Sequence, residues 1–131
     1  MSGFDPIPEN LEALAKVVVD AAFAVHKALG PGLMESVYEV CLCHELSLRG
    51  VRFQRQLELP VVYKNVRLDA GLRIDLLVDE VLILELKAVE KIAPIHEAQL
   101  LTYLKLTGRR LGLLINFNVP LIRDAIKRMA L

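Results

Sequence analysis

The stretch of sequence that decides the fold is Asp75-Leu-Leu-Val-Asp-Glu-Val-Leu-Ile-Leu-Glu85-Leu-Lys87. Its two apolar runs are typical of buried strands, yet they carry two carboxylates and a lysine. Because side chains alternate along a strand, we expect Glu85 and Lys87 on one face and Leu86 on the other. Buried charges are normally paired or bound to a metal. The stretch therefore indicates either a site for a hard cation and a phosphate or a buried Asp/Glu–Lys salt bridge.

The size and charge of the chain narrow the classes of function. Its 131 residues suit one domain, and a hydrophobic content of 54% suits a full core. Sixteen basic residues balance sixteen acidic ones, so the whole molecule offers no strong field to a polyanion. Any nucleic-acid footprint must be local, which disfavours a pure binding protein more than an enzyme with a small charged cleft.

The two cysteines, Cys41 and Cys43, are two residues apart in a helical pattern and do not face each other. They support neither a zinc site nor a disulfide framework, and we expect small buried or half-buried residues in a reducing compartment. The N-terminus lacks the basic flank and apolar block of a signal peptide, and no apolar run approaches 18 residues. These features predict a soluble, cytoplasmic protein.

The periodicity of apolar residues divides the chain into a lead-in, residues 1–9, and one domain, residues 10–131. Helical spacing predicts a helix from Asn10, its N-cap, to Leu29, and glycines end the next two helices. The expected elements are helices over 10–29 and 34–48, strands over 51–64, 72–78 and 81–88, a helix from Pro94 to 106, a strand over 111–117, and a helix from Pro120 to about 129. Asn65 marks a turn after the first strand. This α-α-β-β-β-α-β-α order predicts an α/β sandwich, a central mixed sheet flanked by helices.

Three groups of residues carry a resemblance to a known family. Gly32-Leu-Met-Glu35-Ser-Val-Tyr38 resembles the GxxExxY signature of a group of small bacterial proteins. Asp75 with Glu85-Leu-Lys87 resembles the core motif of the PD-(D/E)XK nuclease superfamily, and Gln99-Leu-Leu-Thr-Tyr103 resembles the QxxxY motif of its RecB-like branch. The resemblance covers about residues 10–128 and implies a restriction-endonuclease-like fold.

The resemblance implies that Asp75, Glu85 and the Leu86 carbonyl ligate Mg²⁺ or Mn²⁺, with Glu35 as a third carboxylate candidate. Oxygen donors suit these ions. A two-residue turn at Asp79-Glu80 would place Asp75 opposite Leu84 and turn Glu85 to the other face. We therefore predict a one-residue offset that sets Asp75 opposite Glu85.

The other implied site residues each have a simpler interpretation. Lys87 would orient or activate the attacking water, or else form an ion pair with Glu85 or Asp75 in the absence of metal. Glu35 would reach the metal, or else compensate a helix dipole. Gln99 and Tyr103 share one helix face and would line the cleft, or else belong to an ordinary amphipathic helix.

The supporting candidates are weaker. Tyr38 is expected to pack, with its hydroxyl on Glu35 or a phosphate, and His96 is placed where it could touch a phosphate. His26 and His44 are expected to be structural. The basic residues near these elements, of which none is singled out, are Arg52, Arg55, Arg73, Lys91, Lys105, Arg109 and Arg110.

Together these features favour metal-dependent hydrolysis of phosphodiester bonds in nucleic acid, with DNA favoured over RNA by family analogy alone. Two other functions remain open. One is a nucleic-acid-binding or assembly module without turnover, and the other is a hydrolase of a small phosphorylated substrate. Since no target-recognition segment is evident, a homodimer or a protein partner could supply reach along a duplex.

Overall fold

A five-stranded sheet in the order β1-β2-β3-β4-β5 forms the centre of the molecule. The computed structural model describes residues 5–131. All neighbouring strands are antiparallel except β3 and β4, which are parallel, so the predicted mixed sheet is confirmed. Its elements are α1 (Glu9–Leu29), α2 (Glu35–Leu48), β1 (Phe53–Tyr63), β2 (Val66–Val78), β3 (Leu82–Lys87), α3 (Pro94–Thr107), β4 (Leu111–Asn116), a 3₁₀ turn η1 (Ile122–Asp124) and β5 (Ile126–Ala130).

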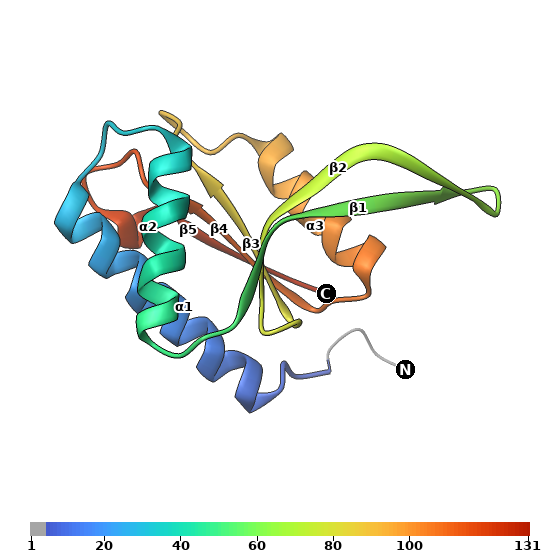
Figure 1. Ribbon diagram of the computed structural model, residues 1–131, viewed down its shortest axis with the longest axis horizontal. Helices are drawn as coiled ribbons and strands as arrows, with labels where there is room; N and C mark the ends of the chain where they lie inside the picture. Colours follow the sequence, from blue (N-terminus) through green and yellow to red (C-terminus); the bar gives the residue numbers. More distant parts are fainter. Residues whose placement is uncertain (1–4) are drawn as a thin grey trace.

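Helices cover both faces of the sheet, as the predicted α/β sandwich requires (Figure 1). Buried residues of α1 and α2 share one core with Leu82, Leu84 and Leu86 of β3, whereas Ile83 packs with α3 in a second core. Since side chains alternate along a strand, Glu85 and Lys87 lie on the same side of β3 as Ile83. The predicted separation of Glu85 and Lys87 from Leu86 is therefore confirmed.

The helix boundaries follow local signals with one exception. The helix α1 begins at Glu9, so the prediction of Asn10 as its N-cap is wrong. Pro8 occupies the cap position, and its carbonyl accepts the amides of Leu11 and Glu12. The predicted lead-in thus ends at Pro8, and its residues 1–4 lie outside the described residues.

The predicted glycine stops are confirmed. Gly50 (φ 72°) and Gly108 (φ 68°) adopt the left-handed conformation just after α2 and α3.

The predicted last helix, from Pro120 to about Met129, is wrong. The chain makes only the short turn η1 and then the strand β5, which pairs with β4 from Ile126↔Ile115 to Ala130↔Leu111. Apolar residues at helical spacing misled the prediction, and burial along β5 does not alternate strictly. The strand wins because it satisfies the edge of β4, whose backbone groups would otherwise lack partners.

The hairpin of β1 and β2 extends well beyond the rest of the sheet (Figure 1). β2 begins at Val66, earlier than the predicted Leu72, and pairs with β1 as far as Tyr63↔Val66. The turn at Lys64 and Asn65, both with positive φ, confirms the predicted turn. A bulge between Leu59 and Val61 bends the pair.

None of the helices in the described part of the chain has the length and apolarity that crossing a membrane requires. Both cysteines are free, Cys43 buried and Cys41 half-buried, which agrees with the expectation of structural thiols.

Candidate functional site

The pairing of β2 with β3 determines where the two candidate carboxylates meet. The partners are Val78↔Leu82, Leu77↔Ile83 and Leu76↔Leu84. A two-residue turn would set Val78 opposite Val81, so the predicted one-residue offset is confirmed. In this register the next position places Asp75 opposite Glu85.

The strands separate at this position, which we call the fork. The pairing of β2 with β3 ends at Leu76. The pairing of β2 with β1 skips Asp75, because the pair Arg55↔Leu76 is followed by Leu57↔Ile74. Side chains replace the missing backbone pairing. The Asp75 amide donates to Glu85 Oε2 (2.9 Å), and the Leu86 amide donates to Asp75 Oδ2 (2.8 Å). These bonds hold both carboxylates at the fork.

The fork concentrates negative charge in a poorly solvated place. Glu85 is 4% exposed, and burial, followed by the charge of Asp75, raises its pKa to about 8. Burial also raises the pKa of Asp75, against a lowering by the Leu86 amide. Burial and then Asp75 raise the pKa of Glu35. The charge of Asp75 therefore destabilises the charged forms of both glutamates.

Within residues 5–131, no basic side chain lies within 4.0 Å of these three carboxylates, and no group of three or more acidic, histidine or cysteine residues is arranged as a metal centre. A buried carboxylate beside a half-buried one, with no ion-pair partner within 4.0 Å in the described part of the chain, is costly, and a hard divalent cation would offset their charge. Magnesium commonly uses one or two protein carboxylates and completes its shell with water and phosphate. The donor set at the fork therefore fits such an ion.

Lys87 lies near the carboxylates without contacting them. Its charge lowers the pKa of Glu35, Asp75 and Glu85, which opposes the effect of burial. The ion pair expected in the absence of metal does not form within 4.0 Å among the described residues. Lys87 as a whole is half-buried, and its ammonium forms no ion pair within 4.0 Å among the described residues.

Helix α3 brings two further candidates together. Gln99 Nε2 donates to the Tyr103 hydroxyl (3.0 Å), so the predicted one-turn pair acts as a unit. Tyr103 is 4% exposed, and burial followed by the charge of Glu85 raises the pKa of its phenol. Tyr103 is thus near Glu85, whereas Gln99 acts through Tyr103.

Tyr38 and His96 have structural contacts. The fully buried Tyr38 ring stacks on Phe117 with centroids 4.7 Å apart, which confirms the packing expectation. Its hydroxyl donates to the Gly30 carbonyl (2.6 Å) and accepts the Leu33 amide (3.2 Å), so it holds the loop before Glu35 rather than Glu35 itself. His96 Nδ1 accepts the Ala93 amide (3.0 Å) at the start of α3.

Comparison with protein families decides the classification. A family model described as the PD-(D/E)XK nuclease superfamily matches residues 12–129, almost the whole chain. The chain belongs to the PD-(D/E)XK nuclease superfamily. Its mixed sheet with flanking helices is accordingly a restriction-endonuclease-like α/β fold. Comparisons with curated proteins and with solved structures give no match.

Sequence reasoning missed two side chains that border the superfamily's core motif in this chain. Glu39 is 6% exposed and accepts Arg55 Nη2 (2.8 Å) and Nε (3.1 Å) on Oε2, and Gln56 Nε2 (2.7 Å) on Oε1. Glu39 follows Glu35 by one helical turn, a spacing that could have revealed it. The role of Gln56 has no comparable local signal.

A third missed residue, Asn116, fixes the chain just beyond Lys87. Its side chain is 1% exposed and exchanges hydrogen bonds with Val89, donating to the carbonyl (2.8 Å) and accepting the amide (3.1 Å). It also accepts the Asn118 amide (3.2 Å). Asn116 therefore orders the segment that leaves β3 at the superfamily's Glu-x-Lys motif.

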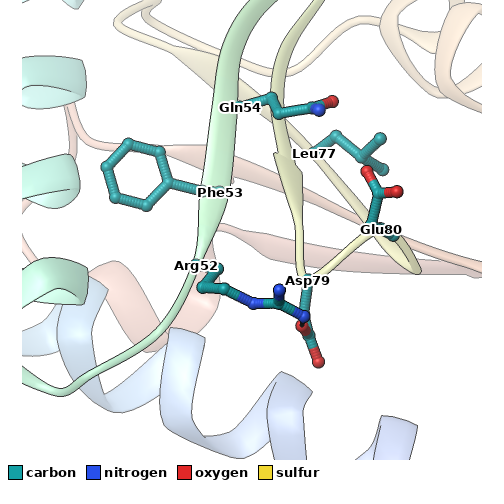
Figure 2. A pocket seen from close by; sticks show the side chains of 6 residues that line it. All are labelled: Arg52, Phe53, Gln54, Leu77, Asp79 and Glu80. Atoms are coloured by element: carbon teal, nitrogen blue, oxygen red, sulfur yellow. Dashed lines mark hydrogen bonds and ion pairs between the residues drawn. The ribbon is translucent and has the colours of Figure 1, made fainter.

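Three of the arginines near the site are held in ion pairs. Arg52 pairs with Asp79 (3.0 Å), Arg55 with Glu39 (2.8 Å) and Arg73 with Glu58 (3.7 Å). Figure 2 shows Arg52 and Asp79 in a pocket at the turn end of β1, β2 and β3, with Gln54 and Glu80. That pocket lies beyond the Asp79-Glu80 turn and includes none of the fork carboxylates.

Proposed function

We propose that this member of the PD-(D/E)XK superfamily hydrolyses phosphodiester bonds of DNA with the help of Mg²⁺ or Mn²⁺. The observation that carries the proposal is the pair of carboxylates at the fork, Glu85 buried and Asp75 half-buried, each held by a backbone amide, with no ion pair within 4.0 Å among residues 5–131 and with Lys87 nearby. The GxxExxY-like and QxxxY-like segments support it, since both contribute side chains near this point.

Asp75 and Glu85 would hold the cation, together with the Leu86 carbonyl and with Glu35 directly or through water. A divalent cation there would lower the pKa of a water molecule and offset charge on the phosphate under attack. Asp75 and Glu85 each accept a hydrogen bond from a backbone amide on one carboxylate oxygen, which fixes their orientation before any ligand binds.

Lys87 supplies the positive charge that the attacking water and the phosphate need. It lies on the Glu85 side of β3, and its ammonium is not held in an ion pair within the described chain. It can therefore orient the nucleophile and bind a phosphate oxygen. The Tyr103 hydroxyl, oriented by Gln99, borders the same space and would contact the substrate backbone.

The choice of DNA rests on the family resemblance. Most arginines near the site are held by acidic partners or backbone carbonyls, so these arginines are less available to a long duplex. We propose that a second copy or a protein partner extends the binding surface.

The test compares the wild type with Asp75→Ala on linear, circular, single-stranded and double-stranded DNA with Mn²⁺ or Mg²⁺. We expect metal-dependent cleavage by the wild type and a loss of at least about 100-fold in the variant. Asp79→Ala is the matched control, because Asp79 lies in the turn of the same hairpin and is exposed. Thermal unfolding of all three proteins checks that they are folded.

Three results would contradict the proposal. Equal cleavage by Asp75→Ala would remove the fork from the reaction. Metal binding without cleavage of any DNA would favour a binding or assembly module. Cleavage of nucleotides but not of polynucleotides would favour a hydrolase of small phosphorylated substrates.

A further inference from the structure

Gln56 has an unusual backbone conformation for a residue inside a strand. Its φ is 49°, in the left-handed region that favours glycine. The other non-glycine residues with positive φ in the described chain are the central pairs of the two hairpin turns, Lys64-Asn65 and Asp79-Glu80. Gln56 alone has this conformation within β1, opposite Asp75. Strain of this kind persists only when the surrounding structure maintains it.

Packing does not account for the strain, because the Gln56 side chain is exposed. Its hydrogen bonds give a better reason. Nε2 donates to Glu39 Oε1 at 2.7 Å and lies 3.5 Å from Asp75 Oδ1. Since a primary amide has two N–H groups, it can serve two carboxylates at once. The bond to Glu39 is the firm one, and the contact with Asp75 is at the long limit.

Glu39 is itself a fixed anchor. It is 6% exposed and accepts two hydrogen bonds from Arg55. The Gln56 side-chain amide is therefore hydrogen-bonded to Glu39 of α2 and at the same time directed toward Asp75. Asp75 is held on its second oxygen by the Leu86 amide (2.8 Å). The carboxylate thus has a donor on each side, from β1 and from β3.

We propose that Gln56 is a positioning residue, retained in a strained backbone conformation so that its amide orients the Asp75 carboxylate toward a divalent cation at the fork. The proposal rests on the proposed function. Outer contacts of this kind typically change metal affinity 10–100-fold when removed. In this proposal the strained backbone at Gln56 lowers the stability of the protein and at the same time keeps the metal site preformed.

Two variants separate the side chain from the backbone. Gln56→Ala and Gln56→Gly both remove the amide, but only glycine relieves the strain. Gln54→Ala is the matched control, since Gln54 lies on the same strand and lines the pocket of Figure 2, which includes none of the fork carboxylates. The measurements are the Kd for Mn²⁺ by calorimetry, without DNA, and the Tm of the metal-free proteins.

We expect the Kd for Mn²⁺ to rise about tenfold or more in both Gln56 variants and to stay unchanged in Gln54→Ala. We also expect Gln56→Gly to unfold about 3 °C or more above Gln56→Ala, and no lower than the wild type. In Gln56→Gly the affinity for Mn²⁺ would then fall without a loss of stability, which a purely structural role cannot produce. In cleavage assays, the Mn²⁺ concentration for half-maximal rate should rise, with kcat at saturating Mn²⁺ changing little.

The inference is overturned if Gln56→Gly binds Mn²⁺ as tightly as the wild type, or if the two variants unfold at the same temperature. Absence of Mn²⁺ binding by the wild type would overturn it together with the proposed function. A wild type that binds Mn²⁺ but cleaves no DNA would defeat only the proposed function, because the Kd comparison would still test Gln56.

Discussion

Burial acts on individual residues in opposite ways in this molecule, depending on what surrounds them. At the fork it raises the pKa of the Asp75 and Glu85 carboxyl groups and so destabilises their charged forms. In α2 it surrounds the Cys43 thiol with apolar side chains and makes it inert. The same desolvation therefore acts on a candidate ligand site in one place and on a packing residue in the other.

The Cys43 thiol should be unreactive in the folded protein. Burial raises its pKa from 9.0 to about 11, so almost none of it is thiolate at pH 8. We expect iodoacetamide at pH 8 to modify Cys41, which is half-buried, well before Cys43, and to modify both thiols equally in urea. Mass spectrometry of the digested protein measures this. Equal rates in the native protein would contradict the buried position of Cys43.

The same raised pKa gives a pH dependence of known sign. The folded state keeps the Cys43 proton to a higher pH than the unfolded state, so its contribution to the free energy of unfolding is complete below about pH 9 and declines between pH 9 and about 11. Urea titrations at pH 8 and pH 10.5 measure the decline. Cys43→Ala controls for other titrating groups and should show a smaller one.

At the scale of elements, the contact between α3 and β4 depends on a glycine. A Cβ atom at Gly112 would lie 2.8 Å from Leu100 Cδ1 and 3.1 Å from its Cγ. Leu100 is fully buried in the core beneath α3 and has little room to move. The helix can therefore approach the strand closely only because residue 112 has no side chain.

We expect Gly112→Ala to lower the free energy of unfolding by about 1–3 kcal/mol through overpacking. Urea unfolding measures the change. The double variant Leu100→Ala/Gly112→Ala tests the cause, because removing the obstructing side chain should make the Gly112 substitution nearly neutral. An equal loss from Gly112→Ala in both backgrounds would show that the clash is not responsible.

The sequence predicts elements well where the signals are local. Glycine stops after two helices and the turn at Asn65 depend on nearby residues and were predicted correctly. The offset between Asp75 and Glu85 was also predicted correctly, but from what the family resemblance requires of the two carboxylates. The strand β5 was missed because its stability comes from the edge of β4, which its own spacing does not reveal. The N-cap of α1 was wrongly assigned to Asn10, because the carbonyl of Pro8, two residues earlier, accepts the first amides of the helix.

Within the candidate site, the core motif was evident from charged residues in apolar strands, whereas the residues that hydrogen-bond around it were not. Glu39 appears in the sequence as one more polar helix residue, and its burial depends on Arg55 and Gln56 across the fold. The sequence gives no sign that a glutamine has a positive φ, because glycine is the residue that favours this conformation. The positioning of Asp75 is therefore a tertiary property that local patterns cannot express.

At the scale of the whole molecule, the stability of the chain is unevenly distributed. The distal hairpin, residues 61–68, pairs only with itself, whereas β3 is paired on both sides near Leu82 and covered by both cores. Two isolated strands are marginally stable in water. In the distal hairpin, the side chains of Val62 (66% exposed), Tyr63 (60%) and Val66 (54%) have little to pack against.

We expect backbone amides of residues 61–68 to exchange with solvent at least about 100-fold faster than those of Ile83 and Leu84. Hydrogen exchange followed by mass spectrometry measures the rates. Amides of Leu76–Val78, on the same strand β2 but inside the sheet, provide the internal comparison and should exchange slowly. Equal protection along the whole of β2 would show that the distal hairpin is stabilised by something other than its own pairing.

The separation of the distal hairpin from the sheet also makes the chain easy to modify. A peptide inserted between Lys64 and Asn65 would begin and end at adjacent residues of an exposed turn, and neither core of the molecule reaches that turn. Exposed turns of this kind tolerate insertions best. An affinity tag or a fluorescent label could therefore be carried there, so that the protein is immobilised or followed with both chain ends free and the carboxylates at the fork undisturbed.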